Sequence, residues 1–102
     1  MKKIKHIDMK GFLSFFILHE LNKKHLCGDV LAELIGKRKG YKLTPGTIYP
    51  TLKRLCRLKL IKMKQKGRKK NYMLTKSGKI ELELSYKTFN KLFSGIKNKI
   101  KR

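Results

Sequence analysis

Hydrophobic positions recur along the chain at spacings of three and four residues, which is the period of a helix with one buried face. A first helix is predicted over residues 9–24. Its apolar positions are Phe12, Leu13, Phe16, Ile17 and Leu21. Phe15 and Leu18 widen this apolar surface, which indicates burial against a second surface. A second helix is predicted to begin after Gly28 and to end at a polar loop with two glycines over residues 36–40.

A third helix and a β-hairpin are predicted next. Thr44 is placed to cap a helix whose first residue is Pro45, a position where the missing N–H of proline costs nothing. The buried face of this helix is defined by Ile48, Leu52 and Leu55. Pro50 lies on the opposite face and is expected to kink the helix or to end its first turn early. Residues 60–74 predict a hairpin, because short strand-like runs flank a cationic glycine turn at residues 65–70.

The residues from Thr75 onward predict one long helix that reaches the C-terminus. Six apolar residues, spaced alternately by four and three, form the heptad seam of a coiled coil: Leu82, Tyr86, Phe89, Phe93, Ile96 and Ile100. Together with Phe12 and Phe15, this seam is expected to form a homodimer interface. Three apolar residues lie off the seam and are expected to dock the helix on its own domain: Ile80, Leu84 and Leu92. The alternative is that the whole seam packs within one chain.

The charge balance indicates the class of partner. The chain carries 28 Lys and Arg against 6 Asp and Glu in 102 residues, a formal charge of +22. Such a charge strains a compact fold by self-repulsion, and it is best understood if a polyanion, above all a nucleic acid, is the partner. An anionic membrane and a plain compositional bias are the weaker alternatives. With 40% hydrophobic residues, the chain is too apolar to be a disordered basic tail.

No residue pattern predicts an enzyme, a metal site or a cofactor. Cys27 and Cys56 form neither a disulfide framework nor a Cys-x-x-Cys pair, and His19 and His25 miss the one-turn spacing of a helical metal pair. The 6 acidic residues are scattered, without a paired general acid and base. The apolar run over residues 12–18 is too short for a membrane span and lacks a signal-peptide cleavage site. The protein is therefore expected to be cytoplasmic and not bound to a membrane.

Three helices followed by a basic hairpin predict a winged helix-turn-helix. In this fold a helix enters the major groove of double-stranded DNA, while the hairpin, or wing, contacts the adjacent backbone or the minor groove. The residues expected to contact DNA lie on the exposed face of the third helix and in the wing: Thr44, Thr47, Tyr49, Pro50, Lys53, Arg54, Arg57, Arg68, Lys69 and Lys70. The alternative is that these charges form an ordinary solvated surface.

At these residues the chain resembles the PadR-type transcriptional regulators. The resemblance lies in residues 43–55, which contain the run Gly46-Thr47-Ile48-Tyr49-Pro50, and continues through Leu60-Ile61, residues 67–75 and Gly78. Two positions depart from the family. Asp29 stands where the family usually has Tyr, and Lys59 stands where it usually has Gly, although Lys disfavours the left-handed backbone that Gly allows. The resemblance implies a dimeric winged-helix DNA-binding protein, commonly a repressor, with the third helix and the wing on DNA.

The sequence thus predicts a mainly α protein with a small β-hairpin. Residues 1–74 are expected to form the winged helix-turn-helix domain and residues 75–102 a C-terminal dimerisation helix. The expected function is sequence-specific regulation of transcription on double-stranded DNA by a homodimer that acts as a repressor. The alternatives are a non-specific architectural DNA-binding protein, and an RNA-associated or protein-interaction module. No pattern identifies a small-molecule effector, although such a regulator could bind one.

Overall fold

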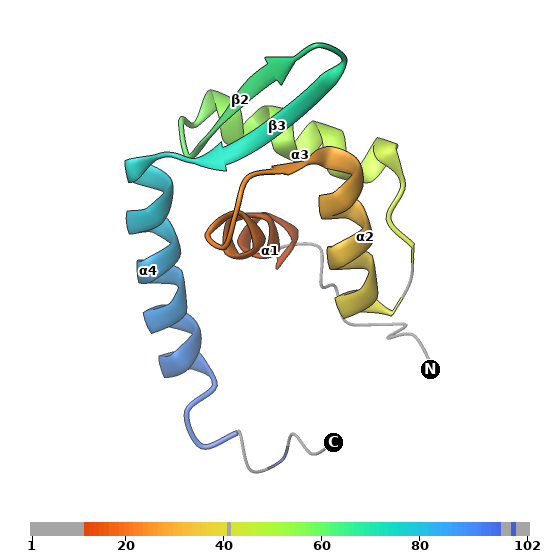
Figure 1. Cartoon of the computed structure of the whole chain (residues 1–102). Helices are drawn as coiled ribbons and strands as arrows, with labels where there is room; N and C mark the ends of the chain where they lie inside the picture. Colours follow the sequence, from red (N-terminus) through yellow and green to blue (C-terminus); the bar gives the residue numbers. More distant parts are fainter. Residues whose placement is uncertain (1–11, 41, 97–98, 100–102) are drawn as a thin grey trace.

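A computed structural model describes residues 12–40, 42–96 and 99 of the chain. The elements in chain order are α1 (Phe12–Leu21), β1 (Leu26–Cys27), α2 (Gly28–Lys39), α3 (Pro45–Arg57), β2 (Ile61–Lys66), β3 (Lys69–Leu74) and α4 (Lys76–Leu92). Figure 1 shows α1 at the centre, α2 and α4 on opposite sides of it, and α3 with the β2–β3 hairpin along one end. The predicted fold class, a winged helix-turn-helix with an additional C-terminal helix, is confirmed.

The first helix, α1, is the centre of the hydrophobic core. It packs against α2, α3 and α4, and its residues Leu13, Ile17, Leu18 and Leu21 are buried. The helix ends at Leu21, three residues earlier than predicted, because the following residues 22–24 are polar and exposed. Residues 9–11 of the predicted helix lie outside the described residues. A helix that is apolar on nearly all sides is expected only where neighbours cover it all round.

The second helix, α2, continues through residues that were predicted to form a loop. It ends at Lys39, and Gly40 closes it in a left-handed conformation (φ 80°) with its N–H bonded to the Gly36 carbonyl at 2.9 Å. Gly36 is buried inside the helix, and the Lys37 ammonium lies 3.9 Å from the Glu33 carboxylate one turn earlier. The prediction of a loop at residues 36–40 was therefore wrong. One glycine costs a helix only about 1 kcal/mol, which burial can outweigh.

A buried carboxylate joins α1 to α2. Glu20 is 5% exposed, and one of its oxygens accepts a hydrogen bond from Nε of Arg38 at 2.8 Å. The Arg38 guanidinium also lies 5.8 Å from the centre of the Phe16 ring. A buried charge is tolerated only when it is paired, so this contact holds the last turn of α2 beside α1.

The third helix begins where the sequence predicted. Thr44 has extended backbone angles and Pro45 is the first helical residue. The Thr44 side chain makes no capping hydrogen bond, so the cap predicted from this residue is not formed; its hydroxyl instead lies 3.2 Å from the Thr47 hydroxyl, and its carbonyl accepts the Ile48 N–H at 3.1 Å as the first bonds of a helix require. Pro50 does not end the helix, which runs on to Arg57.

The turn after α3 holds Lys59 in the left-handed conformation, with φ at 61°. The Leu60 N–H bonds to the Leu55 carbonyl at 3.1 Å and the Lys59 N–H to the Cys56 carbonyl at 3.0 Å. This pair of bonds is the Schellman motif, whose left-handed residue is usually glycine. The hydroxyl of Thr75 donates to the Lys59 carbonyl at 2.6 Å and fixes the turn from the other side. The strain expected from Lys at this position is present.

The predicted hairpin is confirmed, with longer strands and a tighter turn. Lys66 of β2 pairs with Lys69 of β3, so only Gly67 and Arg68 lie between the strands. Gly67 has a φ of 62°, which suits the first position of a two-residue hairpin turn. The assignment of residues 65–70 to the turn was therefore too long, because a glycine in this position lets the strands pair up to the turn itself.

A third strand, β1, was not predicted. Its two residues pair antiparallel with β3, Leu26 with Tyr72 and Cys27 with Asn71, which gives the strand order β1-β3-β2. Two residues carry no alternation that a sequence pattern could detect. Their pairing makes β3 the central strand and leaves β1 and β2 at the two edges of the sheet.

The last helix, α4, packs on α1 through residues that were predicted to form the dimer seam. Leu82 is completely buried in the core of its own chain. The Tyr86 hydroxyl lies 2.5 Å from Nδ1 of His19, and the Phe89 ring centre lies 4.6 Å from that of Phe15. The side chain of Leu82 is not available to a partner chain, so its assignment to the dimer interface was wrong. The heptad spacing identifies a buried face but does not identify the surface that buries it.

The residues expected to dock α4 on its own domain instead face outward, so this prediction was also wrong. The three side chains are 58%, 55% and 62% exposed, in the order Ile80, Leu84 and Leu92. The helix ends at Leu92, earlier than predicted, and Gly95 follows with a φ of 80°. Phe93 and Ile96 are exposed beyond this end, while Ile100 lies outside the described residues.

Candidate nucleic-acid interface

The exposed face of α3 is cationic. Its opposite face is buried and consists of Ile48, Leu52 and Leu55. All the α3 residues predicted to contact DNA, and the Thr44 cap, are exposed: Thr44, Thr47, Tyr49, Pro50, Lys53, Arg54 and Arg57. At about 100° per residue, Lys53 and Arg57 point away from the core. Neither of them forms an ion pair with any of the described residues, so both charges can meet an anionic ligand.

Arg54 lies at the border of this face. Its Nη2 donates a hydrogen bond to the Ser14 hydroxyl of α1 at 2.7 Å. Because a guanidinium has five N–H donors, the others can still reach a phosphate. The contact with α1 therefore orients the side chain before any ligand binds, and it places Arg54 beside the cationic face and not at its centre.

Tyr49 joins the first turns of α2 and α3. A Cβ atom at Gly28 would lie 2.7 Å from the Tyr49 hydroxyl, so glycine leaves the space that the ring occupies. The hydroxyl donates to Oδ1 of Asp29 at 3.3 Å. Burial, and then the negative charge of Asp29, raise the pKa of Tyr49, so the phenol remains protonated. The sequence assigned Tyr49 to DNA without this partner, which no spacing rule would have found.

The wing is the second cationic element. Arg68, Lys69 and Lys70, which were predicted to contact DNA, are exposed at and beside its turn. The exposed cations of β2 were missed, and they are Lys62, Lys64 and Lys66. Lys62 and Lys64 were assigned to the first strand and Lys66 to the turn, and none of the three was among the predicted DNA contacts. The repeat of lysine at every second position was the signal that could have found them.

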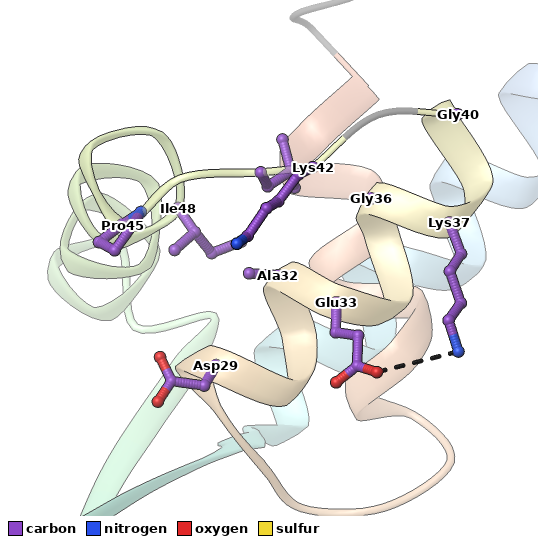
Figure 2. A pocket seen from close by; sticks show the side chains of 10 residues that line it. Asp29, Ala32, Glu33, Gly36, Lys37, Gly40, Lys42, Pro45 and Ile48 are labelled. Atoms are coloured by element: carbon purple, nitrogen blue, oxygen red, sulfur yellow. Dashed lines mark ion pairs between the residues drawn. The ribbon is translucent and has the colours of Figure 1, made fainter.

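A groove of about 720 Å³ lies between α2 and the start of α3, close to Asp29 (Figure 2). The residues that line it are Asp29, Ala32, Glu33, Gly36, Lys37, Gly40, Lys42, Leu43, Pro45 and Ile48. Figure 2 shows the charged side chains along α2, with Lys37 paired to Glu33. The described residues contain no group of three His, Cys, Asp or Glu that could hold a metal ion. Of the helices in the described ranges, none is long and apolar enough to cross a bilayer.

Comparison with protein families matches residues 17–84 to the transcriptional regulator PadR-like family. Comparison with curated proteins finds no match. Among solved structures, a PadR family transcription regulator from hypervirulent Clostridium difficile is 30% identical with a TM-score of 0.72, and the match covers 87% of this chain and 97% of that one. A PadR-like transcriptional regulator from Bacillus cereus is 28% identical with a TM-score of 0.79, and the match covers 88% of this chain and 92% of that one.

A third structure is that of Bacillus subtilis PadR in complex with operator DNA. It is 33% identical with a TM-score of 0.60, and the match covers 70% of this chain but 44% of that one. The family match over residues 17–84 includes the whole of α2, α3 and the wing, which are the elements that carry the cationic face. The chain therefore belongs to the PadR-like family of transcriptional regulators.

Proposed function

We propose that this protein binds double-stranded DNA sequence-specifically as a homodimer and represses transcription. The observation that carries the proposal is that the exposed cations of α3 and of the wing lie on neighbouring elements of a chain with a net charge of +22. The relative from Bacillus subtilis, solved with operator DNA, supports DNA as the partner.

The elements suggest a division of roles on DNA. The exposed face of α3 enters the major groove, where Lys53 and Arg57 are placed to meet guanine edges or phosphates. Thr47 and Arg54 lie at the sides of this face, within reach of phosphates along the groove. Arg68 at the wing turn contacts the neighbouring backbone or minor groove. A dimer bound at an operator represses by excluding other proteins from that stretch of DNA.

The homodimer is proposed to form through residues 75–102, while residues 1–74 bind DNA. Phe93 and Ile96 are the seam residues left exposed among the described residues. Phe12 and Phe15 are half-buried beside Phe89 and form the border of this surface. The division at residue 74 is one of function, because Leu82 and Tyr86 pack against the winged domain.

The second candidate function is non-specific, architectural DNA binding. It is favoured by the composition of the cationic surface, since the hairpin over residues 61–74 contains five lysines and one arginine and no acidic residue. Lysine binds phosphate as a point charge and contributes less than arginine to bidentate recognition of bases.

In-vitro selection from a random duplex pool discriminates between the two functions. A palindromic consensus with half-sites one helical turn apart is expected of a dimeric regulator. Recovery of the pool without a consensus would instead favour the architectural function. In either case affinity should fall about 10³- to 10⁵-fold between 50 and 200 mM salt, if the dimer makes 6–10 phosphate contacts. Affinity that is nearly independent of salt would remove the electrostatic basis of both proposals.

Two substitutions locate the DNA-binding face. Lys53→Ala in α3 and Arg68→Ala in the wing should both weaken binding while leaving thermal stability unchanged, because both side chains are exposed. If Lys53 contacts a base, its loss should cost about 1–3 kcal/mol and relax the preference at one position. Lys87→Ala, on the exposed side of α4, removes the same charge and is the matched control. Equal affinity of all three variants would place the interface elsewhere.

A further inference from the structure

The groove between α2 and the start of α3 exists because one side of α2 carries very little side chain. Ala32, Gly36 and Gly40 follow one another at intervals of four residues, which places them along the same side of the helix. Gly36 is buried, although a glycine inside a helix costs roughly 1 kcal/mol relative to alanine. The small residues leave a space of about 720 Å³ that α3 does not fill.

The other wall of the groove is apolar and belongs to the chain that leads into α3. Leu43 and Ile48 are buried, and the ring of Pro45 is exposed. Binding sites for small molecules are typically concave, apolar spaces of about 300–1,000 Å³ with a few polar groups that orient the ligand. The groove has this size and this kind of lining, so it suits the apolar body of a small molecule.

Both carboxylates at the groove already have a partner. The Tyr49 hydroxyl donates to the Asp29 carboxylate at 3.3 Å, and the Lys37 ammonium lies 3.9 Å from the Glu33 carboxylate. The second pair is one turn apart on α2 and is largely exposed. Because each negative charge is offset in this way, the carboxylates do not make the groove a site for a cation.

Lys42 is the charged residue that faces the groove without a charged partner among the described residues. It is exposed and takes part in none of their ion pairs. Figure 2 shows its side chain extended toward Ala32 and Ile48. The whole chain carries a charge of +22, and such a field attracts anions and repels cations. An ammonium group beside an apolar wall in this field suits a carboxylate that is attached to an apolar body.

We propose that this groove binds an amphipathic organic anion, whose apolar body packs against α2 and Ile48 and whose carboxylate pairs with Lys42, and that this ligand opposes DNA binding. The regulatory part of the inference rests on the proposed function. Lys42 lies three residues before the first residue of α3, so the bound anion adds negative charge beside the helix that is proposed to meet phosphates. Like charges repel, and DNA weakens ligand binding by the same factor by which the ligand weakens DNA binding.

The probe for the site is naphthoate, an apolar ring system with one carboxylate. Nuclear magnetic resonance of the isotope-labelled full chain, without DNA, locates the ligand and gives its affinity. The amide signals of Ala32, Gly36 and Ile48 should shift during the titration, while those of α4 should not. A ligand of this size is expected to have a dissociation constant of about 1 mM or below. Naphthylmethylamine has the same ring system and a positive charge, and it should leave these signals unchanged.

Two pairs of variants test the role of charge. Lys42→Gln removes the ammonium and should bind naphthoate about fivefold more weakly. Lys87→Gln removes the same charge from an exposed position of α4 and should bind it as the wild type does. Ala32→Glu places a carboxylate in the groove, and Ala32→Gln places a group of the same size there without charge. The Glu variant should bind at least about fivefold more weakly than the Gln variant. Thermal melting checks that all four variants fold.

Fluorescence anisotropy with a selected operator duplex measures the effect on DNA binding. Saturating naphthoate should lower the DNA affinity of the wild type about 5- to 150-fold, the usual range of coupling between two sites. Acetate at the same concentration is the control, because it changes the ionic strength equally but has no apolar body. The effect of naphthoate should persist in Lys87→Gln and be lost in Ala32→Glu.

Three results would overturn the inference. Signal shifts confined to Phe15 and Phe89 would place the ligand between α1 and α4 and not in the groove. Equal binding of naphthoate and naphthylmethylamine would show that Lys42 does not select the charge of the ligand. A loss of DNA affinity no greater than that caused by acetate would exclude the regulatory role. Failure of the proposed function is visible separately, because the wild type would then not prefer the selected duplex to a random one, while the titration without DNA would still report on the groove.

Discussion

Lys59 offers a direct test of how the turn between α3 and the wing is built, because Lys59→Gly should stabilise the protein. The residue has a φ of 61° and is held there by the two backbone bonds of the Schellman motif and by the Thr75 hydroxyl. For a residue with a Cβ atom, the left-handed conformation costs roughly 1–2 kcal/mol. Glycine removes this cost but adds about 0.5–1 kcal/mol of chain entropy to the unfolded state.

The expected net effect of Lys59→Gly is a gain of about 0.75 kcal/mol in the free energy of unfolding, which is the difference between the midpoints of these two ranges. At about 4–8 °C per kcal/mol for a domain of this size, the melting temperature should rise by roughly 3–6 °C. Lys59→Ala is the matched control, since it removes the same charge and side chain but keeps the Cβ atom. Its stability should remain close to that of the wild type.

The measurement is urea denaturation of the three proteins, with thermal melting as a second readout. Stabilisation of both variants to the same extent would mean that relief of charge repulsion, and not of backbone strain, is responsible. A Lys59→Gly variant that is less stable than Lys59→Ala would refute the reasoning, because glycine would then gain nothing from the left-handed turn.

Three further predictions follow from single contacts. Gly78→Ala should lower the free energy of unfolding by about 1–3 kcal/mol, because its Cβ would lie 1.9 Å from the Leu60 carbonyl oxygen; an unchanged urea midpoint would contradict this contact. Burial lowers the pKa of His19 below 6.5, as do the charges of Arg38 and Lys23, so stability should be full above pH 6.5 and fall as the pH drops toward the lowered pKa. The loss of stability at low pH should be smaller in His19→Asn. If urea denaturation gives the same pH dependence of stability for this variant and the wild type, His19 is not its source. Phe93→Asp should give a folded monomer in sedimentation, since burial of each Phe93 in a dimer contributes about 1.5–3 kcal/mol and a carboxylate opposes it; a dimeric variant would place the interface elsewhere.

The sequence by itself determined the local chemistry of the chain. The Thr44-Pro45 start of α3, the Thr75 start of α4 and the hairpin were all predicted, because caps, turns and strand alternation depend on residues within a few positions of one another. The buried face of α3 followed from the spacing of its apolar residues, and the cationic residues of its exposed face followed from the same period. The strain at Lys59 was likewise visible from one residue that stands where glycine is usual.

Only the tertiary structure decided which surface covers each apolar face. The spacing of apolar residues in α4 predicts that Leu82 and Tyr86 are buried. The same spacing is expected whether they pack against α1 or against a second subunit, because it identifies the buried side of the helix but not what packs on it. The continuation of α2 through Gly36 and the pairing of β1 with β3 depend on neighbours distant in sequence, and so does the contact of Tyr49 with Asp29. These features depend on packing between segments that lie far apart in the sequence. A pattern read over a few neighbouring residues contains only one of the two segments, so it cannot predict the contact.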